Sequence, residues 1–147
     1  MAGRVEAIHL AQAEGEPMRA VGRIRLVAGV GIEGDRYATG RGHFSKSPGT
    51  GRALTLVEAE ALESVALQPA DARRNVITRG IELNALVGRR FRVGGVLCEG
   101  TRLCEPCTYL EGLVKKPLLE ALLHRGGLRA DVLENGEIRV GDEVTVS

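Results

Sequence analysis

The chain has 147 residues, with 20 basic and 19 acidic side chains and a formal net charge of +1. This balance argues against bulk nucleic-acid binding, which usually needs a basic excess, and 3% aromatic residues without tryptophan argue against a base-stacking platform. The length and the 44% hydrophobic content are typical of one globular domain, expected over residues 1–147.

Three features of the sequence bear on the compartment. No apolar run approaches the ~20 residues that span a membrane. The first residues hold no hydrophobic signal core. Three cysteines are too few for a disulfide framework. We therefore expect a cytoplasmic protein.

The first half of the chain is predicted to form strands around a long loop. Alternating apolar residues predict strands over 5–10 and 18–28. Residues 29–52 contain seven glycines and few apolar side chains, which predicts a long loop of the kind that often carries function. A short strand over 53–57 leads into a helix over 58–67, with acids in its first turn.

The second half is again mostly strands. We predict a strand over 74–78 and a hairpin over 89–98 that turns at Gly94-Gly95. A helical composition over 110–123 contains Pro117, which divides it and begins the second piece.

The end of the chain carries the strongest hairpin signal. Residues 128–133 and 138–146 flank Asn135-Gly136, a dipeptide typical of hairpin turns. Most predicted strands are joined by short turns, so the sheet should be mixed or antiparallel, and closure into a barrel would hide its edges. The predicted fold class is mostly β with short α segments, near 58–67 and 108–123.

Charge is distributed unevenly along the chain. Residues 73–92 contain six Arg and one Glu, whereas residues 131–147 contain one Arg and five acids. Seventeen of the 20 basic residues are Arg, whose planar fork suits phosphate and carboxylate. A local arginine cluster in a nearly neutral chain favours a small anionic ligand over a polymer.

Two clusters of polar residues are candidate binding sites for such a ligand. The segment 31–37 includes Gly34, Asp35 and Arg36, and is either a glycine-rich turn with a local Asp–Arg pair or a binding loop. Arg73-Arg74-Asn75 is either a solvated charged face or part of an anion site. Adjacent strand residues point to opposite faces, so a regular strand could not aim both arginines into one pocket.

The cysteines allow several interpretations. Cys104-Glu105-Pro106-Cys107 could be half of a zinc site, a redox pair, or a reactive thiol at a helix start. A zinc site would need further ligands from Cys98, His43, His9 or His124. Buried cysteine also serves as a small apolar residue, which suits Cys98 within its strand.

A fourth cluster, His124-Arg125-Gly126-Gly127, is either an ordinary helix end followed by glycine or part of a binding site. In this order and spacing, the four clusters resemble the MOSC domain, the C-terminal domain of molybdenum cofactor sulfurases. The resemblance rests on Gly31–Arg36, Arg73–Ile81, Cys104–Cys107, His124–Ala130 and Gly136–Asp142, and it covers nearly the whole chain.

The resemblance implies a stand-alone MOSC domain with a barrel-like fold, which binds a molybdenum–pterin cofactor (molybdopterin) or transfers sulfur. In relatives that hold the cofactor, a cysteine of this motif ligates molybdenum, and the Pro-Cys pair maps onto Pro106-Cys107. Cys104 lies where relatives often have another residue, and it is the nearest rival for the chemistry. Cofactor sulfurases also have a large pyridoxal-phosphate domain; this chain has no room for one, so we do not expect that cofactor.

We predict that Arg36, Arg73, Arg74 and Arg125 border one cleft and that some of them bind the cofactor's phosphate, together with glycine-rich backbone amides. Cys107 is the predicted metal ligand, and Cys107 and Cys104 are the predicted catalytic residues. The full set of expected cofactor-binding residues is Gly34, Asp35, Arg36, Arg73, Arg74, Asn75, Arg125 and Gly126.

Three roles compete at this stage. The chain could be the molybdenum subunit of an oxidoreductase that reduces N-hydroxylated compounds, which would need a separate electron-transfer partner. It could be a non-catalytic carrier that takes sulfur from a cysteine desulfurase. It could instead be a small zinc- or anion-binding structural module. None of these roles involves nucleic acid or a membrane.

Overall fold

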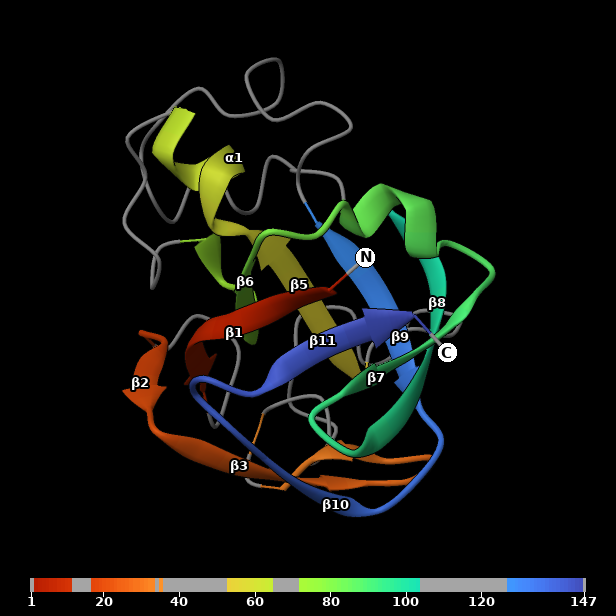
Figure 1. The fold of residues 1–147 in the computed structure, drawn as a ribbon. Helices are drawn as coiled ribbons and strands as arrows, with labels where there is room; N and C mark the ends of the chain where they lie inside the picture. The colour runs from red at the N-terminus through yellow and green to blue at the C-terminus, as the bar shows by residue number, and fades with distance from the viewer. Residues whose placement is uncertain are drawn as a thin grey trace.

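The computed structural model describes residues 2–11, 17–33, 35, 53–64, 72–103 and 127–146 (Figure 1). Short strands dominate this part of the chain, accompanied by one α-helix and one 3-10 helix. In chain order the elements are β1 (Ala2–Leu10), β2 (Arg19–Val21), β3 (Arg23–Val27), β4 (Gly31–Ile32), β5 (Leu54–Glu58), α1 (Ala59–Ser64), β6 (Val76–Arg79), the 3-10 helix η2 (Leu83–Leu86), β7 (Arg90–Val93), β8 (Val96–Leu103), β9 (Leu128–Val132), β10 (Gly136–Arg139) and β11 (Glu143–Val146).

Seven of the described strands close into a barrel. They pair in the order β11-β7-β8-β9-β5-β6-β1, and β1 pairs back with β11 to complete the ring. Strand β2 extends the sheet as an antiparallel neighbour of β1. β5 and β6 run parallel and the other named strand pairs run antiparallel, so the predicted mostly β class and the predicted mixed sheet are both confirmed.

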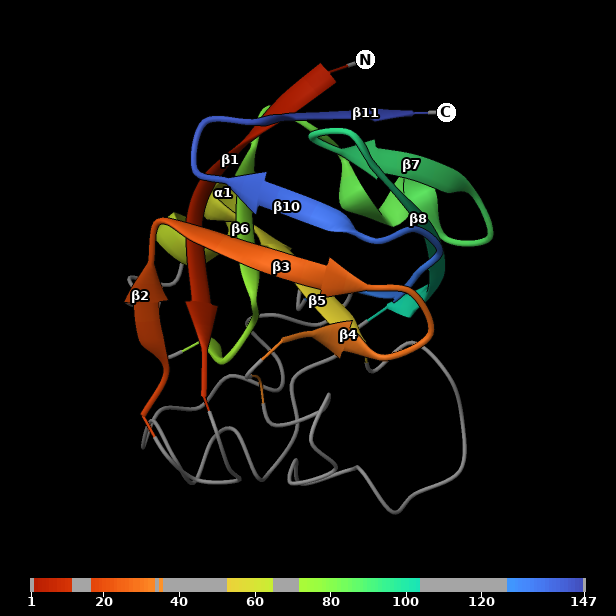
Figure 2. The same cartoon turned by 90° about the horizontal axis from the view of Figure 1, so that it is seen from below.

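A second sheet covers one side of the barrel. It contains β10, β3 and β4, which lie across the view in Figure 2. Its inward side chains, Ile24, Leu26, Ile32 and Ile138, belong to the same hydrophobic cluster as the barrel residues. The two sheets therefore share one core.

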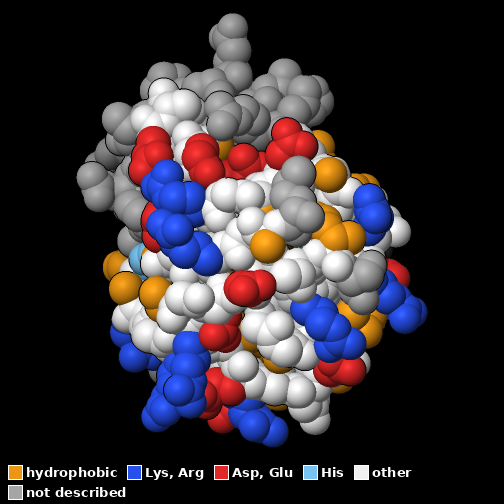
Figure 3. Space-filling view, viewed as in Figure 1, with side chains coloured by type: hydrophobic (Ala, Val, Ile, Leu, Met, Phe, Trp, Pro, Cys, Tyr) orange, Lys and Arg blue, Asp and Glu red, His pale blue; other side chains and the backbone are white. Residues whose placement is uncertain are grey.

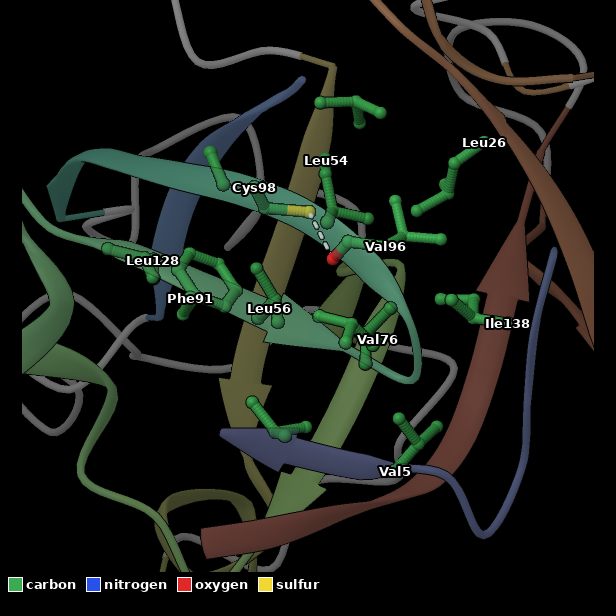
Figure 4. Close-up of a cluster of buried hydrophobic side chains, with 14 of the residues drawn as sticks. Val5, Leu26, Leu54, Leu56, Val76, Phe91, Val96, Cys98, Leu128 and Ile138 are labelled. Atoms are coloured by element: carbon green, nitrogen blue, oxygen red, sulfur yellow. Dashed lines mark hydrogen bonds between the residues drawn. The ribbon is translucent and has the colours of Figure 1, made fainter. Parts of the chain in front are cut away.

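Cys98 is a core residue. Its side chain lies among Leu54, Val96 and other apolar groups, and its thiol donates to the backbone oxygen of Val96 at 3.8 Å (Figure 4). Burial, with a smaller contribution from the Glu134 carboxylate, raises the pKa of the Cys98 thiol to about 12. The prediction that Cys98 packs as a small apolar residue is confirmed.

The last predicted hairpin is wrong. β9 pairs with β5 and β8, β10 pairs with β3, and β11 pairs with β1 and β7. The Asn135 side-chain oxygen accepts a hydrogen bond from the backbone N–H of Ala28, which ties this turn to the connection between β3 and β4. The Asn-Gly turn thus redirects the chain from one sheet to the other.

Three boundaries also differ from the predictions. The strand predicted over 18–28 is divided at Gly22 into β2 and β3. α1 begins at Ala59, one residue later than the helix predicted over 58–67, and residues 65–67 lie outside the described residues. β6 begins at Val76, two residues later than predicted. The helix predicted over 110–123 lies outside the described residues. Among the elements that are described, no helix has the length and apolar character needed to cross a membrane.

Candidate functional site

A buried polar cluster lies where β1 ends and where β5 and β6 begin. Ile8, Leu54 and Val76 point into the core. By strand alternation, their neighbours His9, Thr55 and Asn75 lie on the opposite face of the sheet. Asp35, Arg73 and Arg74 join them; these six residues, which we call the polar cluster, are each between 0 and 9% exposed. Buried polar groups at this density need partners from within the cluster or from a ligand.

Asn75 is the centre of the polar cluster. Its side-chain oxygen accepts hydrogen bonds from the backbone N–H of Thr55 at 3.1 Å and from the Thr55 hydroxyl at 3.0 Å. Its amide donates to the backbone oxygen of His9 at 3.2 Å and to Oδ1 of Asp35 at 3.3 Å. One side chain therefore connects β1, β5, the start of β6 and the loop that carries Asp35.

Asp35 attaches the glycine-rich segment to the barrel. Its Oδ1 atom accepts from the backbone N–H of Ala11 at 3.2 Å as well as from Asn75. The carboxylate therefore bonds to groups far away in the chain, which a purely local turn would not require. Arg36, with which the sequence suggests a local pair, lies outside the described residues.

Arg73 and Arg74 lie in the connection before β6, so strand alternation does not separate them. Arg73 has φ of 56°, and it is the one non-glycine residue with positive φ in the described chain. This conformation is costly for a long side chain, and such strain concentrates at ligand sites. Nη1 of Arg74 donates to the backbone oxygen of Ala72 at 3.2 Å. Two arginines are thus buried immediately before Asn75 in the chain.

His9 contributes a buried imidazole. Its Nδ1 atom is buried and makes no hydrogen bond with the described residues, and the residue is only 5% exposed. Burial lowers the pKa of His9 below its ordinary value of 6.5, so the ring is neutral at pH 7. A neutral imidazole has one donor nitrogen and one acceptor nitrogen.

Three of the other four arginines of the 73–92 segment pair with acidic side chains elsewhere. Arg79 pairs with Glu6 and Glu63, Arg90 with Glu99, and Arg92 with Glu134. The hydrogen bond from Arg79 lowers the pKa of Glu6. Figure 3 shows basic and acidic side chains interspersed on this face. The basic residues that are concentrated at 73–92 in the sequence therefore do not form one basic surface. Two of them, Arg73 and Arg74, are buried.

The structure describes the positions of some of the predicted site residues. It brings Asp35 into contact with Asn75 and buries Arg73 and Arg74 beside Asn75 in the chain. The remaining predicted residues, for which the single-cleft arrangement stays a prediction, lie outside the described residues: Gly34, Arg36, Cys104, Cys107, Arg125 and Gly126. Sequence reasoning missed the role of Thr55 and the place of His9 in the polar cluster. The sequence does contain a signal for both residues, because each is a polar residue that lies between apolar residues within a predicted strand.

Comparison with protein families gives one match. The model of the MOSC domain matches residues 49–145. No curated protein sequence gives a significant match to the chain.

Solved structures share the fold. The YuaD protein from Bacillus subtilis has a TM-score of 0.81 and 19% identity, with 99% of this chain and 96% of that chain covered. YiiM from Escherichia coli has a TM-score of 0.72 and 19% identity, covering 100% and 70%. YiiM from Geobacillus stearothermophilus has a TM-score of 0.71 and 15% identity, covering 99% and 75%. The barrel and its accessory sheet are therefore a recurring architecture.

Proposed function

This chain belongs to the MOSC domain family, and from that premise we propose that it binds a molybdenum–pterin cofactor, with the Cys107 thiolate as metal ligand or persulfide carrier. The observation that carries the proposal is the polar cluster. It holds two buried arginines and a strained backbone in the connection just before β6.

The described residues fit the phosphate end of such a cofactor. Arg73 and Arg74 would hold the phosphate, because guanidinium forks form charge-assisted hydrogen bonds with its oxygens. Asn75 and Asp35 would maintain the shape of the connection that presents these arginines. The unpartnered Nδ1 atom of His9 leaves a hydrogen-bonding position for a ligand.

Cys107 would supply the soft ligand that molybdenum prefers. When bound, the cofactor would provide two-electron redox chemistry for reducing an N-hydroxylated compound. Electrons would come from a separate protein partner. Pyridoxal phosphate has no part in the proposal.

The related carrier role uses the same thiol. The Cys107 thiolate would attack the outer sulfur of a desulfurase persulfide, forming a new S–S bond as the old one breaks. The donor cysteine would leave as its thiolate, so the transfer needs no oxidant. The Cys104 thiolate would then attack the inner sulfur of this persulfide, so that a Cys104–Cys107 disulfide forms as the persulfide S–S bond breaks and the outer sulfur leaves as hydrosulfide. An amidoxime-reduction assay with a suitable reductase separates the oxidoreductase role, in which product forms, from the carrier role.

We expect Cys107→Ser to lose molybdenum or persulfide, because the serine hydroxyl is a harder and far less acidic donor. The measurement is the molybdenum and zinc content of protein made in a host that synthesises the cofactor, with persulfide assayed alongside. Cys98→Ser is the matched control: it should keep its molybdenum and lose mainly stability, since its thiol lies in the core. Cys104→Ser should be intermediate or silent.

Other patterns would contradict the assignment. If Cys104→Ser loses molybdenum while Cys107→Ser keeps it, the ligand is Cys104. If the parent protein contains stoichiometric zinc and no molybdenum, and all three variants lose that zinc and unfold, the chain is a structural zinc module.

We also expect Arg74→Ala to weaken cofactor binding by roughly 10- to 150-fold, since a hydrogen bond to a charged group contributes about 1.5–3 kcal/mol. The measurement is the dissociation constant of the released cofactor by titration calorimetry. Arg23→Ala, at an exposed position of β3, is the control and should bind like the parent. Equal affinity of the two variants would place the phosphate away from Arg74.

A further inference from the structure

The His9 side chain has a defined place in the barrel wall. Ile8 and Leu10 enter the core, so His9 projects from the other face of β1. Its backbone N–H donates to the backbone oxygen of Asn75 at 2.7 Å, and its backbone oxygen accepts from the Asn75 amide at 3.2 Å. On its other side it lies opposite Ala20 of β2. The strand pairing thus places the backbone of His9 directly opposite Asn75, which follows Arg73 and Arg74 in the chain.

The Nδ1 atom is the unusual feature of this position. It is fully buried and has no hydrogen-bond partner among the described residues. Two neighbouring polar side chains, by contrast, are bonded: Asn75 makes four side-chain hydrogen bonds, and Oδ1 of Asp35 accepts two. Buried polar atoms in native proteins are nearly always paired, so a buried imidazole nitrogen without a hydrogen bond points to a missing partner.

The charge of the surroundings selects the kind of partner. The described polar cluster contains the two cations Arg73 and Arg74 and the single anion Asp35. Burial lowers the pKa of His9, so its ring stays neutral and Nδ1 can carry a proton for donation. A neutral donor beside an excess of positive charge suits an anionic oxygen.

We propose that His9 is a further binding residue of this site and that its Nδ1–H donates a hydrogen bond to a phosphate oxygen of the bound cofactor. The inference rests on the proposed function, and it adds a residue of β1 to a site that the sequence clusters place in loops. It also explains why a polar ring occupies a buried strand position where an apolar residue would pack without an unpaired atom.

Three substitutions separate this role from simple packing. His9→Asn places its amide near the position of Nδ1, whereas His9→Gln reaches toward the position of Nε2. His9→Phe keeps a planar ring and removes both nitrogens. We expect phosphate affinity to fall about tenfold or more in His9→Phe and His9→Gln and to be largely kept in His9→Asn.

We expect the stability of the His9 variants to change independently of their affinity for phosphate. Without ligand, His9→Phe should unfold at the same or a higher urea concentration than the parent, because it removes an unpaired buried polar atom. A residue with only a structural role would lose stability and affinity together. This opposite behaviour of His9→Phe is the signature of a ligand-facing nitrogen.

The direct readout is the ¹⁵N resonance of the His9 imidazole during titration with inorganic phosphate, assigned by its absence from the His9→Phe spectrum. We expect Nδ1 to shift with the fraction of phosphate bound, and molybdenum content to follow the same order among the variants. If the parent binds phosphate or molybdenum while Nδ1 does not move and all variants bind equally, the inference fails and the proposed function stands. If the parent binds neither, both fail.

Discussion

Replacing Asn75 with alanine should lower the free energy of unfolding by about 3–5 kcal/mol, since it removes four hydrogen bonds between buried groups, one of them to a carboxylate. The backbone N–H of Thr55 loses its side-chain acceptor, and the backbone oxygen of His9 and Oδ1 of Asp35 each lose a donor. The measurement is the urea midpoint of equilibrium unfolding. Such a loss is a large share of the about 5–15 kcal/mol that stabilises a domain.

A double-mutant cycle provides the control for Asn75. Asn75→Asp keeps the acceptor for Thr55 but places a second carboxylate against Asp35, so it should be at least as destabilising as alanine. Adding Asp35→Asn restores a donor facing a carboxylate and should recover part of the loss. If Asn75→Ala costs less than about 1 kcal/mol, or if the second substitution recovers nothing, the two side chains are not coupled as described.

Gly127→Ala should also destabilise the fold strongly, by about 1–3 kcal/mol from each of two sources. Gly127 has φ of 114°, a conformation that side chains disfavour. In addition, a Cβ at this position would lie 2.1 Å from the backbone oxygen of Leu56. Since Leu56 pairs with Leu128, relief of the clash would have to separate the start of β9 from β5.

Gly141→Ala is the matched control for Gly127. It has a similar φ of 98°, but a Cβ there would meet nothing within 4 Å. The free energy of unfolding of both variants is measured in urea. The difference between their losses gives the contribution of the close approach to Leu56. Equal losses would mean that only the backbone conformation matters at Gly127. The glycine of this motif therefore has a packing role besides the helix-ending role that its sequence context suggests.

Much of the fold follows from local patterns. Short runs rich in apolar residues predict β1, β5, β7 and β8. In β7 and β8 nearly every second side chain is buried, as expected of a strand that covers a core. Gly94-Gly95 predicts the β7–β8 hairpin, in which Val93 pairs with Val96. These features need only neighbouring residues, so a single sequence contains them.

The pairing of distant strands does not follow from such patterns. Asn135-Gly136 has the composition of a hairpin turn, yet β9 and β10 lie in different sheets. The alternation of apolar and polar residues predicts which side chains of a strand are buried. It does not predict which other strand is its partner, because many strands have the same pattern. The choice was made by contacts such as that of Asn135 with Ala28, which are 107 residues apart.

The sequence by itself determined the mostly β class, the motif blocks of the MOSC family, and the polar residues Asp35, Arg73, Arg74 and Asn75 as candidates. Only the tertiary structure decided that Asn75 bonds to both Asp35 and Thr55, that three arginines of the basic segment pair with acids, and that His9 joins the polar cluster. The physical reason is that hydrogen bonds and ion pairs depend on distances between atoms of different strands. Those distances are set when the barrel closes, and no spacing along the chain records them.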